Sequence, residues 1–484
     1  MSYKIGNRYQ QTMLPEAIEN YVGEDDPVRV YDAFVEALDF SELGIELDRN
    51  KVGNSSYDPI AMMKLLVYGY SYGWRSSRKL ERAIHHNLSF IWLMGGLKPD
   101  HKTIANYRRN NKKALKKVLS QCARLCIELN LIEGNTLFLD GSKIRGNASI
   151  NQTHTEKSLE KKLEKITEKI DELLEVCEET DDSEKDSLVK VSKEIKGQKK
   201  LETKVKETLE KLKESDRDKI NLTDNECINT KGRQGSHAGF NTQTVVDGKN
   251  GLILNNDVVT ENNDLNQFSN QITKANELLE SNCKTACADA GYSNVNNLKE
   301  IVDQEIEVIV PNQKQAAHKP KAEDPFTKDK FKYDKDKNCY TCPEGKTLEY
   351  IMDKKQKKVH VYRIKDGSDC VGCKNYGKCT STENGRMITR LEEEETKEML
   401  AKLYETEEAQ EVYKKRKEKV ELPFGHIKRN LNGGTMLMRG IDGANAEMAI
   451  NCTCFNIARM ITLLGGVRPF IKEFIKLRLN KGKK

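Results

Sequence analysis

The sequence lacks any apolar run as long as the roughly 18 residues that a transmembrane helix needs, and it lacks the apolar segment of a secretory signal peptide. We therefore expect no membrane partner and a cytoplasmic location. In that compartment cysteines stay reduced, so the thirteen cysteines of the chain are not expected to form disulfides. Those at regular spacing are instead candidate metal ligands.

The chain also lacks an excess of one charge, because 81 basic residues nearly balance 75 acidic ones and leave a net charge of +6. The total charge alone therefore indicates no polyanionic partner. The distribution is more informative, since basic residues cluster between positions 73 and 117 and again from Arg468 to Lys484. Clustered cations are typical of surfaces that contact DNA phosphates. On this ground Arg108 and Arg109 are candidate DNA-binding residues.

A length of 484 residues is too great for one ordinary hydrophobic core and predicts two or three folding units. Residues 1–125 are expected to be mostly helical, with Asp58 as the N-cap of one helix, Pro59 in its first turn and Asp100 as the cap of another. Short helices with basic outer faces are typical of helix-turn-helix-like DNA-binding units. A bundle of helices that serves only packing is the alternative.

Residues 156–216 differ from the rest because they are rich in Glu and Lys and carry no cluster of reactive side chains. Leu159, Leu163, Ile166 and Ile170 follow one another at spacings of four, three and four residues. This spacing predicts an antiparallel helical hairpin or short coiled coil, inserted as an arm. Dimerisation and DNA clamping are the two roles that we consider for it.

The other regular elements alternate between strands and helices. A β-hairpin is expected over 240–260, because two β-rich runs flank a turn sequence with two glycines. Asp264 is expected to cap the helix that follows, and the helix at 444–464 is expected to be amphipathic. The remaining elements are strands at 136–144, 284–290 and 305–311 and helices at 294–303 and 390–427.

Three acidic residues occupy notable positions in this pattern. Asp140 sits in the middle of the first strand, Asp289 ends a later strand and Glu421 lies on the late helix. A carboxylate in an apolar strand is costly to bury unless a cation or a hydrogen-bond donor meets it. Two such aspartates and a helical glutamate suit hard divalent cations such as Mg²⁺. Two ions about 3.5–4 Å apart can activate an attacking oxygen and stabilise the leaving one in phosphoryl transfer.

Three sequence motifs contain these acids: LFLDGSK, CADAGYS and YKKRKEKVELPFGHIK. Together with the basic helical N-terminal region, the helical insertion and the cysteine cluster, they closely resemble the DDE transposases of bacterial insertion sequences. The resemblance covers most of the chain. It implies an α/β fold with a ribonuclease-H-like catalytic core, an all-α N-terminal DNA-binding region, a helical hairpin insertion and a small Cys-rich insertion. It also implies that Asp140, Asp289 and Glu421 form a catalytic triad holding two Mg²⁺ or Mn²⁺ ions.

The same resemblance implies an activity and its partners. The enzyme would cut double-stranded DNA at the terminal inverted repeats of a mobile element and join the freed 3′-hydroxyl to target DNA, acting as a homodimer. Two other functions stay open on the residues alone. One is a DNA-binding protein that has lost catalysis, and the other is a metal-dependent nuclease that cuts without joining.

Pattern and resemblance together predict how the chain divides. The catalytic core is assembled from separate segments, because two insertions interrupt it. The predicted divisions are the DNA-binding region over 1–125, the core over 130–155, 220–312 and 385–465, the helical hairpin over 156–216, the Cys-rich insertion over 313–384 and a basic tail over 466–484.

Residues around the glutamate match the family pattern with one departure. By the resemblance, Lys428 corresponds to a lysine downstream of the glutamate, and Tyr413 and Arg416 correspond to an aromatic and a basic position upstream. The basic side chains would face DNA. Four residues rather than three separate Arg416 from Glu421. Glu418 is therefore the alternative glutamate, although its neighbours are charged, which is typical of a solvated position.

Several nearby residues carry further predictions. Lys143 and Arg145, just past the first aspartate, are candidate phosphate contacts. Asn241 and Gln243 alternate along the hairpin and either line the site or face solvent. Pro423 predicts that the late helix is bent or restarted near the glutamate.

The cysteines fall into two groups. Cys339 with Cys342 and Cys370 with Cys373 form two CxxC pairs, which suit a tetrahedral Zn²⁺ site with a structural role. Cys379 is a fifth candidate ligand, and free thiols are the alternative. The cysteines of the second group have apolar neighbours on helical segments and are expected in the core. They are Cys122, Cys126, Cys452 and Cys454.

Overall fold

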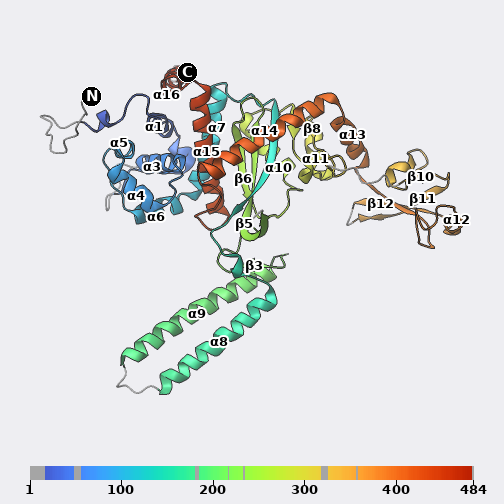
Figure 1. The fold of residues 1–484 in the computed structure, drawn as a ribbon, viewed down its shortest axis with the longest axis horizontal. Coiled ribbons are helices and arrows are strands. Elements are labelled where there is room, and N and C mark those ends of the chain that lie inside the picture. The colour runs from blue at the N-terminus through green and yellow to red at the C-terminus, as the bar shows by residue number, and fades with distance from the viewer. Residues whose placement is uncertain are drawn as a thin grey trace, which may run out of the picture. The chain divides into compact units, whose positions relative to one another are not determined.

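The computed structural model describes residues 17–47, 56–179, 185–215, 217–232, 235–317, 325–355 and 358–481. The chain divides into two compact units (Figure 1). The first unit comprises Met1–Ala286 and Lys415–Lys484, and the second comprises Cys287–Lys414. Helices and strands are mixed along the chain, so the expectation of a mixed α/β protein is confirmed.

Short helices fill the N-terminal part of the first unit. After a 3-10 turn at Ile18–Tyr21 they are α1 (Val28–Glu36), α2 (Phe40–Leu43), α3 (Pro59–Ser71), α4 (Ser77–His86), α5 (Leu88–Leu93), α6 (His101–Asn110) and α7 (Lys112–Glu128). Asp58 Oδ1 accepts a hydrogen bond from Ile60 N at 3.0 Å, and Asp100 Oδ1 accepts one from Thr103 N at 2.7 Å. Both predicted caps are confirmed, since each carboxylate satisfies an N–H that has no partner inside its helix.

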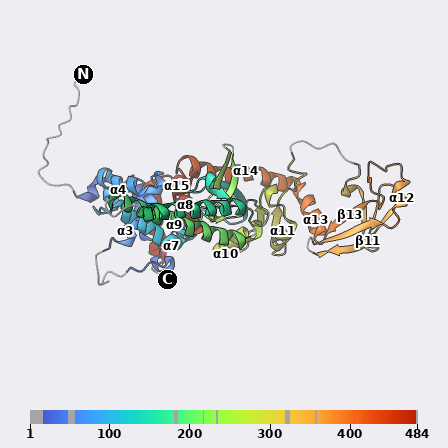
Figure 2. The same ribbon diagram turned by 90° about the horizontal axis from the view of Figure 1, so that it is seen from below.

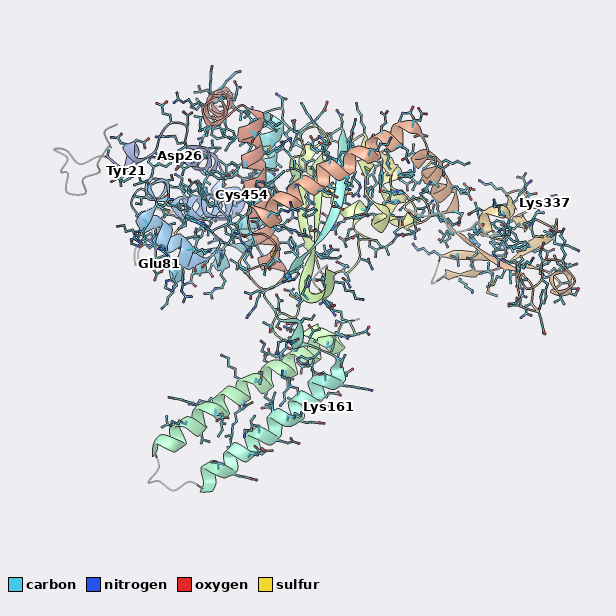
Figure 3. All side chains as sticks on the ribbon, in the orientation of Figure 1. Tyr21, Asp26, Glu81, Lys161, Lys337 and Cys454 are labelled. Atoms are coloured by element: carbon cyan, nitrogen blue, oxygen red, sulfur yellow. The ribbon has the colours of Figure 1, made fainter. Side chains whose placement is uncertain are left out.

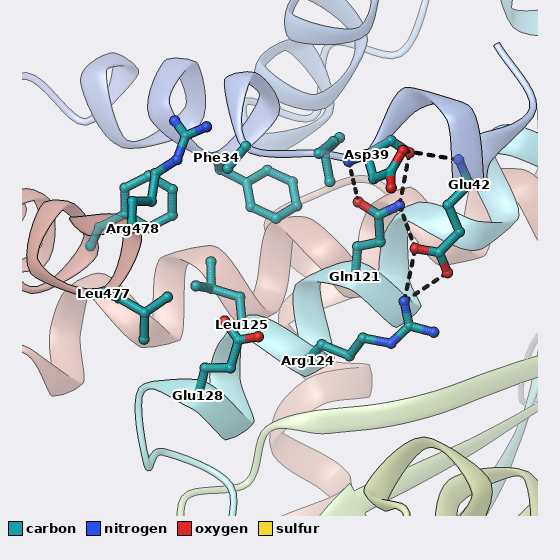
Figure 4. Close-up of a pocket in the computed structure, with 12 residues that line it drawn as sticks. Phe34, Asp39, Glu42, Gln121, Arg124, Leu125, Glu128, Leu477 and Arg478 are labelled. Atoms are coloured by element: carbon teal, nitrogen blue, oxygen red, sulfur yellow. Dashed lines mark hydrogen bonds and ion pairs between the residues drawn. The ribbon is translucent and has the colours of Figure 1, made fainter. Parts of the chain in front are cut away.

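Polar contacts fasten α2 to α7 beside a pocket of about 330 Å³ (Figure 4). Gln121 of α7 accepts a hydrogen bond from Asp39 N at 2.9 Å and donates one to Asp39 O at 3.0 Å. Arg124 donates to both carboxylate oxygens of Glu42, at 2.7 and 2.9 Å. Phe474 of α16 (Val467–Lys481) also lines the pocket. None of the described residues that line this pocket is a predicted active-site residue.

The sheet of the first unit contains β1 (Thr136–Arg145), β4 (Ile228–Gly232), β5 (Gly235–Asp247), β6 (Ile253–Val259) and β7 (Thr285–Cys287). The strand order is β4-β5-β1-β7, and β6 also pairs with β5. β1 and β5 are antiparallel, with Asp140 opposite Thr244. At the hairpin turn between β5 and β6 the Asp247 carboxylate accepts hydrogen bonds from the N–H groups of Gly134 and Lys249, each at 2.9 Å. The predicted first strand and the hairpin are confirmed.

Helix α15 (Ile441–Leu463) packs against α3, α7 and β6. Every residue from Gly443 to Ile457 is buried, so the prediction of an amphipathic helix is wrong. Two of its polar side chains serve the sheet, because Asn445 Oδ1 and Asn456 Oδ1 accept hydrogen bonds from the backbone of β6, each at 2.9 Å. These bonds occupy strand N–H groups that would otherwise be open to another chain. No single described helix is long and apolar enough to span a membrane, and α15 with Val467–Leu479 meets that test only as a pair bent by 102°.

Helix α10 (Phe268–Leu279) packs against α7 and against strands β1, β5 and β6. Gln267 occupies its N-cap position, three residues after the predicted cap. The prediction of Asp264 as the cap is therefore wrong. The carboxylate of Asp264 is used instead by side chains of β5, as described below.

Two long helices form an arm of the first unit (Figure 1). They are α8 (Glu156–Glu179) and α9 (Lys185–Lys213), and they lie side by side in both ribbon views (Figure 2), next to a short ladder of β2 (Thr153–His154) and β3 (Ile220–Asn221). Their facing apolar side chains form a common core that includes Leu159, Ile166, Ile170, Val205 and Leu212. Lys161 is exposed on α8 (Figure 3). The predicted helical hairpin is confirmed as an element of structure.

The second unit contains a 3-10 turn at Ala290–Tyr292, α11 (Val295–Val302), β8 (Glu307–Ile309), α13 (Glu394–Tyr404) and the first part of α14 (Glu407–Arg429).

The second unit also has a five-stranded antiparallel sheet in the order β13-β12-β11-β10-β9. The strands are β9 (Lys332–Asp334), β10 (Cys339–Thr341), β11 (Thr347–Lys354), β12 (Val359–Ile364) and β13 (Met387–Leu391), with a short helix α12 (Ser368–Val371) before β13. The buried core of this sheet comprises Phe331, Tyr340, Leu348, Tyr362, Ile364 and Ile388. Val361 of β12 is buried as well, and a core of this size is small for ordering five strands.

Candidate active site

Asp140 lies in the middle of β1, in the first unit. Leu137 and Leu139 of the same strand are fully buried, whereas the Asp140 side chain keeps 21% of its surface exposed. Because successive side chains of a strand point to opposite faces, Asp140 and Ser142 share one face of the sheet. That face is the one reached by the C-terminal part of α14.

Two basic side chains of α14 meet this face of β1. Arg416 Nη1 lies 3.3 Å from Asp140 Oδ1, and the Arg416 side chain is 15% exposed. Lys428 Nζ donates a hydrogen bond to Ser142 Oγ at 2.5 Å and approaches the Lys143 carbonyl oxygen at 3.4 Å. Burial lowers the pKa of Lys428, and the carboxylate of Asp140 acts in the opposite direction. The predicted Asp140, Arg416 and Lys428 are therefore brought together, and Ser142 joins them.

Glu421 is exposed on α14 and lies on the same face of the helix as Lys428. Seven residues separate the two, which places them about 20° apart around the helix axis at 3.6 residues per turn. Glu418 is also exposed, but it lies about 80° from Lys428 on the side away from the buried Val420. Helix α14 continues through Pro423 without a break, so the predicted restart there is wrong. The helix geometry favours Glu421 over Glu418.

The opposite face of β1 and β5 carries a second polar group. Asp264 Oδ1 accepts hydrogen bonds from Asn241 Nδ2 and Gln243 Nε2, each at 2.7 Å. Lys143 Nζ lies 3.9 Å from the same oxygen, and burial lowers the pKa of Lys143 while Asp264 raises it. Asn241 and Gln243 are fully buried and thus neither line the face of Asp140 nor meet solvent. Lys143 points away from Asp140 as well, so we do not retain it as a phosphate contact.

Asp289 belongs to the second unit and follows the last residue of β7 by two positions. Its Oδ1 accepts a hydrogen bond from Gly291 N at 2.8 Å, which fixes the carboxylate at the start of a 3-10 turn. Tyr413, also in this unit, packs its ring edge-on against Tyr404, with the ring centroids 5.2 Å apart. A packing role is therefore sufficient to explain Tyr413.

The other predicted DNA-binding residues differ in exposure. Arg108 is partly buried and donates a hydrogen bond to the Arg75 carbonyl oxygen at 2.7 Å, which is a structural contact. Arg109 is exposed and donates to Asn106 Oδ1 at 2.7 Å, and Arg145 is exposed at the end of β1. Helix α4 presents the densest group of exposed basic side chains near them. The group comprises Arg78, Lys79, Arg82, His85 and His86.

A divalent cation is the cofactor that the carboxylates predict. In the part of the chain that the structure describes, no three carboxylate, imidazole or thiol groups stand close enough together to hold a metal ion. The donor chemistry nevertheless fits Mg²⁺, because carboxylate oxygens are its preferred protein ligands. The setting of Asp140 also fits. A partly buried carboxylate in an apolar strand needs a cation beside it, and here the Arg416 guanidinium occupies that position.

The cysteines of the second unit gather at one pocket. Its lining includes Cys342, Cys370, Cys373 and Cys379. Burial raises the pKa of Cys379, Arg386 lowers it, and the other three sulfurs raise it further, as expected for thiols that lie near one another. Cys339 is buried within β10 and is not among the residues that line the pocket.

The cysteines of the first unit that were expected in the core are all buried. They are Cys122, Cys126, Cys452 and Cys454. Cys126 Sγ lies 3.4 Å from Met460 Sδ, between α7 and α15. Figure 3 shows Cys454 within the packed helices of this unit. The prediction of a packing role is confirmed.

Family models match two stretches of the chain. Residues 16–110 match the model described as Transposase domain (DUF772), and residues 341–461 match the model described as Transposase DDE domain. The chain is a DDE-type transposase. It is thus an enzyme that cuts and transfers DNA. The DDE match includes Glu421, Lys428 and the cysteine pocket of the transposase, but it does not extend to Asp140 or Asp289.

Among solved structures, a piggyBac transposase synaptic complex with hairpin DNA is similar to this transposase with a TM-score of 0.35 and 9% sequence identity. The similarity covers 94% of this chain and 80% of that chain. It is too low to support a conclusion about the fold or the reaction. No curated protein matches the chain.

Proposed function

We propose that this transposase cuts the ends of a mobile DNA element and joins the freed 3′-hydroxyl to target DNA. Asp140, Asp289 and Glu421 would be the carboxylates of its Mg²⁺-dependent site, in a ribonuclease-H-like core. The position of Asp140 carries the proposal. Its carboxylate is partly buried at the centre of β1 and lies 3.3 Å from the Arg416 guanidinium of α14, the helix that also carries Glu421. A charge held in such a place is a candidate for catalysis, because partly buried charges are costly and cluster at functional sites.

When bound, Mg²⁺ would activate an attacking oxygen and stabilise the leaving oxygen of the phosphodiester. Asp140 would offer its ligand from a rigid strand, and Glu421 from a continuous helix. The carboxylate of Asp289 is oriented by the N–H of Gly291, which is the kind of supporting contact that keeps a metal ligand in position.

Arg416 and Lys428 would position DNA at this site. Both are basic side chains that reach the same face of β1 as Asp140. A guanidinium binds a carboxylate or a phosphate with the same geometry, so Arg416 can exchange the carboxylate of Asp140 for a DNA phosphate. Lys428 is held by Ser142 and would supply a point charge beside it.

The N-terminal helices of the first unit would bind double-stranded DNA at the terminal inverted repeats. The exposed basic side chains of α4, together with Arg109, suit contacts with phosphates. We also propose a homodimer, because the reaction must bring two DNA ends together, and this part rests on analogy with the reaction class.

The test uses the full chain, Mg²⁺ and linear DNA that carries the inverted repeats flanking its coding region. Asp140→Asn, Asp289→Asn and Glu421→Gln should each lower strand cleavage by roughly 10³-fold or more, since each removes several kcal/mol of charge stabilisation. DNA binding in a gel shift should persist. Glu418→Gln is the matched control on the same helix and should cleave normally. Full activity in Asp140→Asn or Asp289→Asn would remove the assignment.

A second measurement tests whether the carboxylates share one site. Fe²⁺ replaces Mg²⁺, and ascorbate with peroxide then generates hydroxyl radicals at the bound ion. Backbone scission is expected next to both Asp140 and Asp289 in the same molecule. Scission near only one of them would show that the two aspartates do not meet at the metal.

The alternative functions give different products. A nuclease would cut the element ends but would leave pre-cut ends unjoined in a strand-transfer reaction. A DNA-binding protein without catalysis would shift the DNA in a gel and leave it intact with either Mg²⁺ or Mn²⁺. Transfer of pre-cut ends to target DNA therefore distinguishes the proposed function from both.

A further inference from the structure

A pocket of about 30 Å³ in the second unit is lined by four cysteines. Cys342 follows β10, whereas Cys370, Cys373 and Cys379 lie between β12 and β13. Apolar side chains such as Leu348 form other parts of the wall. A space of this size suits one ion or one water molecule, because pockets for organic ligands are about ten times larger.

Two of the four sulfurs accept hydrogen bonds from similar turns. Lys346 N donates to Cys342 Sγ at 3.3 Å, and Arg386 N donates to Cys370 Sγ at 3.4 Å. Each donor directly follows a glycine with positive φ, at +80° for the first turn and +76° for the second. N–H donors of this kind stabilise a thiolate, and contacts that orient metal ligands take the same form. The first turn carries its own sulfur, Cys342, whereas the second donates to the sulfur of Cys370 in α12.

Close packing restricts the second of these turns. A Cβ atom added at Gly385 would lie 3.3 Å from Cys370 Sγ and would overlap Ile364. Any larger residue would also be strained there, because φ is +76°. The backbone therefore approaches the sulfur closely only because position 385 is glycine.

Arg386 is a cation of the lining that can offset a group of thiolates, whereas Lys346 Nζ pairs with Asp369, which lines the pocket together with Glu344. Four thiolates and one Zn²⁺ carry a net charge of −2, which nearby cations would offset. Lys346 and Arg386 both line the pocket, and Arg386 Nη1 also donates a hydrogen bond to the Cys379 carbonyl oxygen at 2.8 Å.

We propose that Cys342, Cys370, Cys373 and Cys379 bind one structural zinc ion. Cys379 thereby takes the place that the CxxC spacing assigned to Cys339. Thiolates are soft ligands, and four of them in a closed site favour Zn²⁺ over Mg²⁺ or Mn²⁺. No three of the described sulfurs stand close enough together to hold a metal ion, so the proposal includes rotation of cysteine side chains on binding.

The zinc ion stabilises the five-stranded sheet of the second unit. That sheet has a small buried core, and Cys342, Cys370 and Cys379 pack against this core. A metal that links the turn after β10 to the segment before β13 adds its binding free energy to folding. The role is structural and separate from the carboxylate site, so the proposed function does not depend on it.

The experiment measures metal in the full-length chain purified from zinc-supplemented cells without chelator. The expected result is a single zinc ion per chain, with a cobalt-substituted form that shows the absorption of tetrahedral thiolate coordination. Cys379→Ser should lose the metal almost completely. Cys339→Ser is the matched control and should keep it, because Cys339 lies outside the pocket. Metal that persists in Cys379→Ser but disappears in Cys339→Ser would overturn the ligand set.

A measurement on the unchanged chain covers the case in which Cys379→Ser does not fold. N-ethylmaleimide labelling is compared with and without a chelator, and the labelled cysteines are located by mass spectrometry. The four pocket cysteines should become reactive only after chelation, whereas labelling of Cys339 should not follow metal removal in the same way. Iron in place of zinc, or the absence of bound metal, would refute the proposal, while DNA cleavage by the same preparation would leave the proposed function standing.

Discussion

The sheet of the first unit and the five-stranded sheet of the second unit are stabilised in different ways. The first is covered by α7, α10 and α15, and two buried side chains of α15, Asn445 and Asn456, accept hydrogen bonds from the backbone of the edge strand β6. The second has a small core of buried aromatic and aliphatic residues and a group of cysteines beside them. A large core can contain polar groups because it can satisfy them, whereas a small core needs a cross-link.

Both sheets also hold charged side chains. The Asp140 carboxylate is partly buried in the first sheet, and α14 holds the Arg416 guanidinium beside it. In the second unit the Arg390 side chain of β13 is 8% exposed, so this sheet also buries a charge, and its cysteines suit a structural ion. Each of the following predictions tests one side of this contrast.

The largest effect on stability is expected from breaking a buried ion pair of the first unit. Arg75 Nη1 lies 2.8 Å from Glu447 Oε1, and the Glu447 side chain is fully buried. Arg75→Met would leave that carboxylate without its cation and should lower the free energy of unfolding by about 3–5 kcal/mol. Chemical denaturation followed by tryptophan fluorescence measures the change.

The matched control is the same substitution at a solvent-exposed pair, Arg468→Met, where Arg468 pairs with Asp25 at 2.8 Å. It should leave stability almost unchanged, because exposed pairs are screened by water and salt. Equal losses in the two variants would show that burial does not set the strength of these pairs.

A smaller effect is expected from a cavity in each sheet. Leu137 of β1 and Leu348 of β11 are both fully buried, and replacing either by Ala should cost about 2–5 kcal/mol. Leu348→Ala should abolish hydrogen-exchange protection across β9–β13, because the core there is small. Leu137→Ala should raise exchange mainly near β1. A purely local response to Leu348→Ala would show that the five-stranded sheet is stabilised by more than its core and its cysteines.

The smallest effect concerns acid stability of the first unit. Burial raises the pKa of Asp257, but its bonds to Lys274 at 2.6 Å and Lys116 at 3.0 Å outweigh this and lower the pKa overall. A carboxyl group with a lowered folded pKa stabilises the fold above its unfolded pKa, and this contribution is lost as pH falls through the folded pKa. Asp257→Asn should therefore reduce stability near neutral pH and flatten its decline below about pH 4. An unchanged acid limb in thermal melts would show that the two lysines do not hold this carboxylate.

Local patterns predicted many elements of the fold. Asp58 and Asp100 cap their helices, because an N-cap is decided within four residues. The β5–β6 hairpin forms around Asp247 for the same local reason. Asp264 is different, because its partners Asn241 and Gln243 lie more than twenty residues away and compete with the helix for its carboxylate.

The predictions that depend on contacts between distant parts of the sequence fail for a common reason. Helix α15 has an amphipathic pattern, yet tertiary packing buries its polar side chains against β6 and the N-terminal helices. The CxxC spacing favours Cys339 over Cys379 as a metal ligand. The strand alternation of β10, however, directs the Cys339 side chain away from the pocket. Sequence spacing cannot show which of two faces a residue occupies until the strands are paired.

The sequence by itself determined the helical N-terminal region, the arm, the first strand with its aspartate and the helix with its glutamate, because periodicity and capping act over a few residues. Only the tertiary structure decided that Arg416 and Lys428 reach the face of Asp140, that Lys143 points the other way, and that four particular cysteines share one pocket. These outcomes depend on strand register and helix rotation, which are set by the packing of segments hundreds of residues apart.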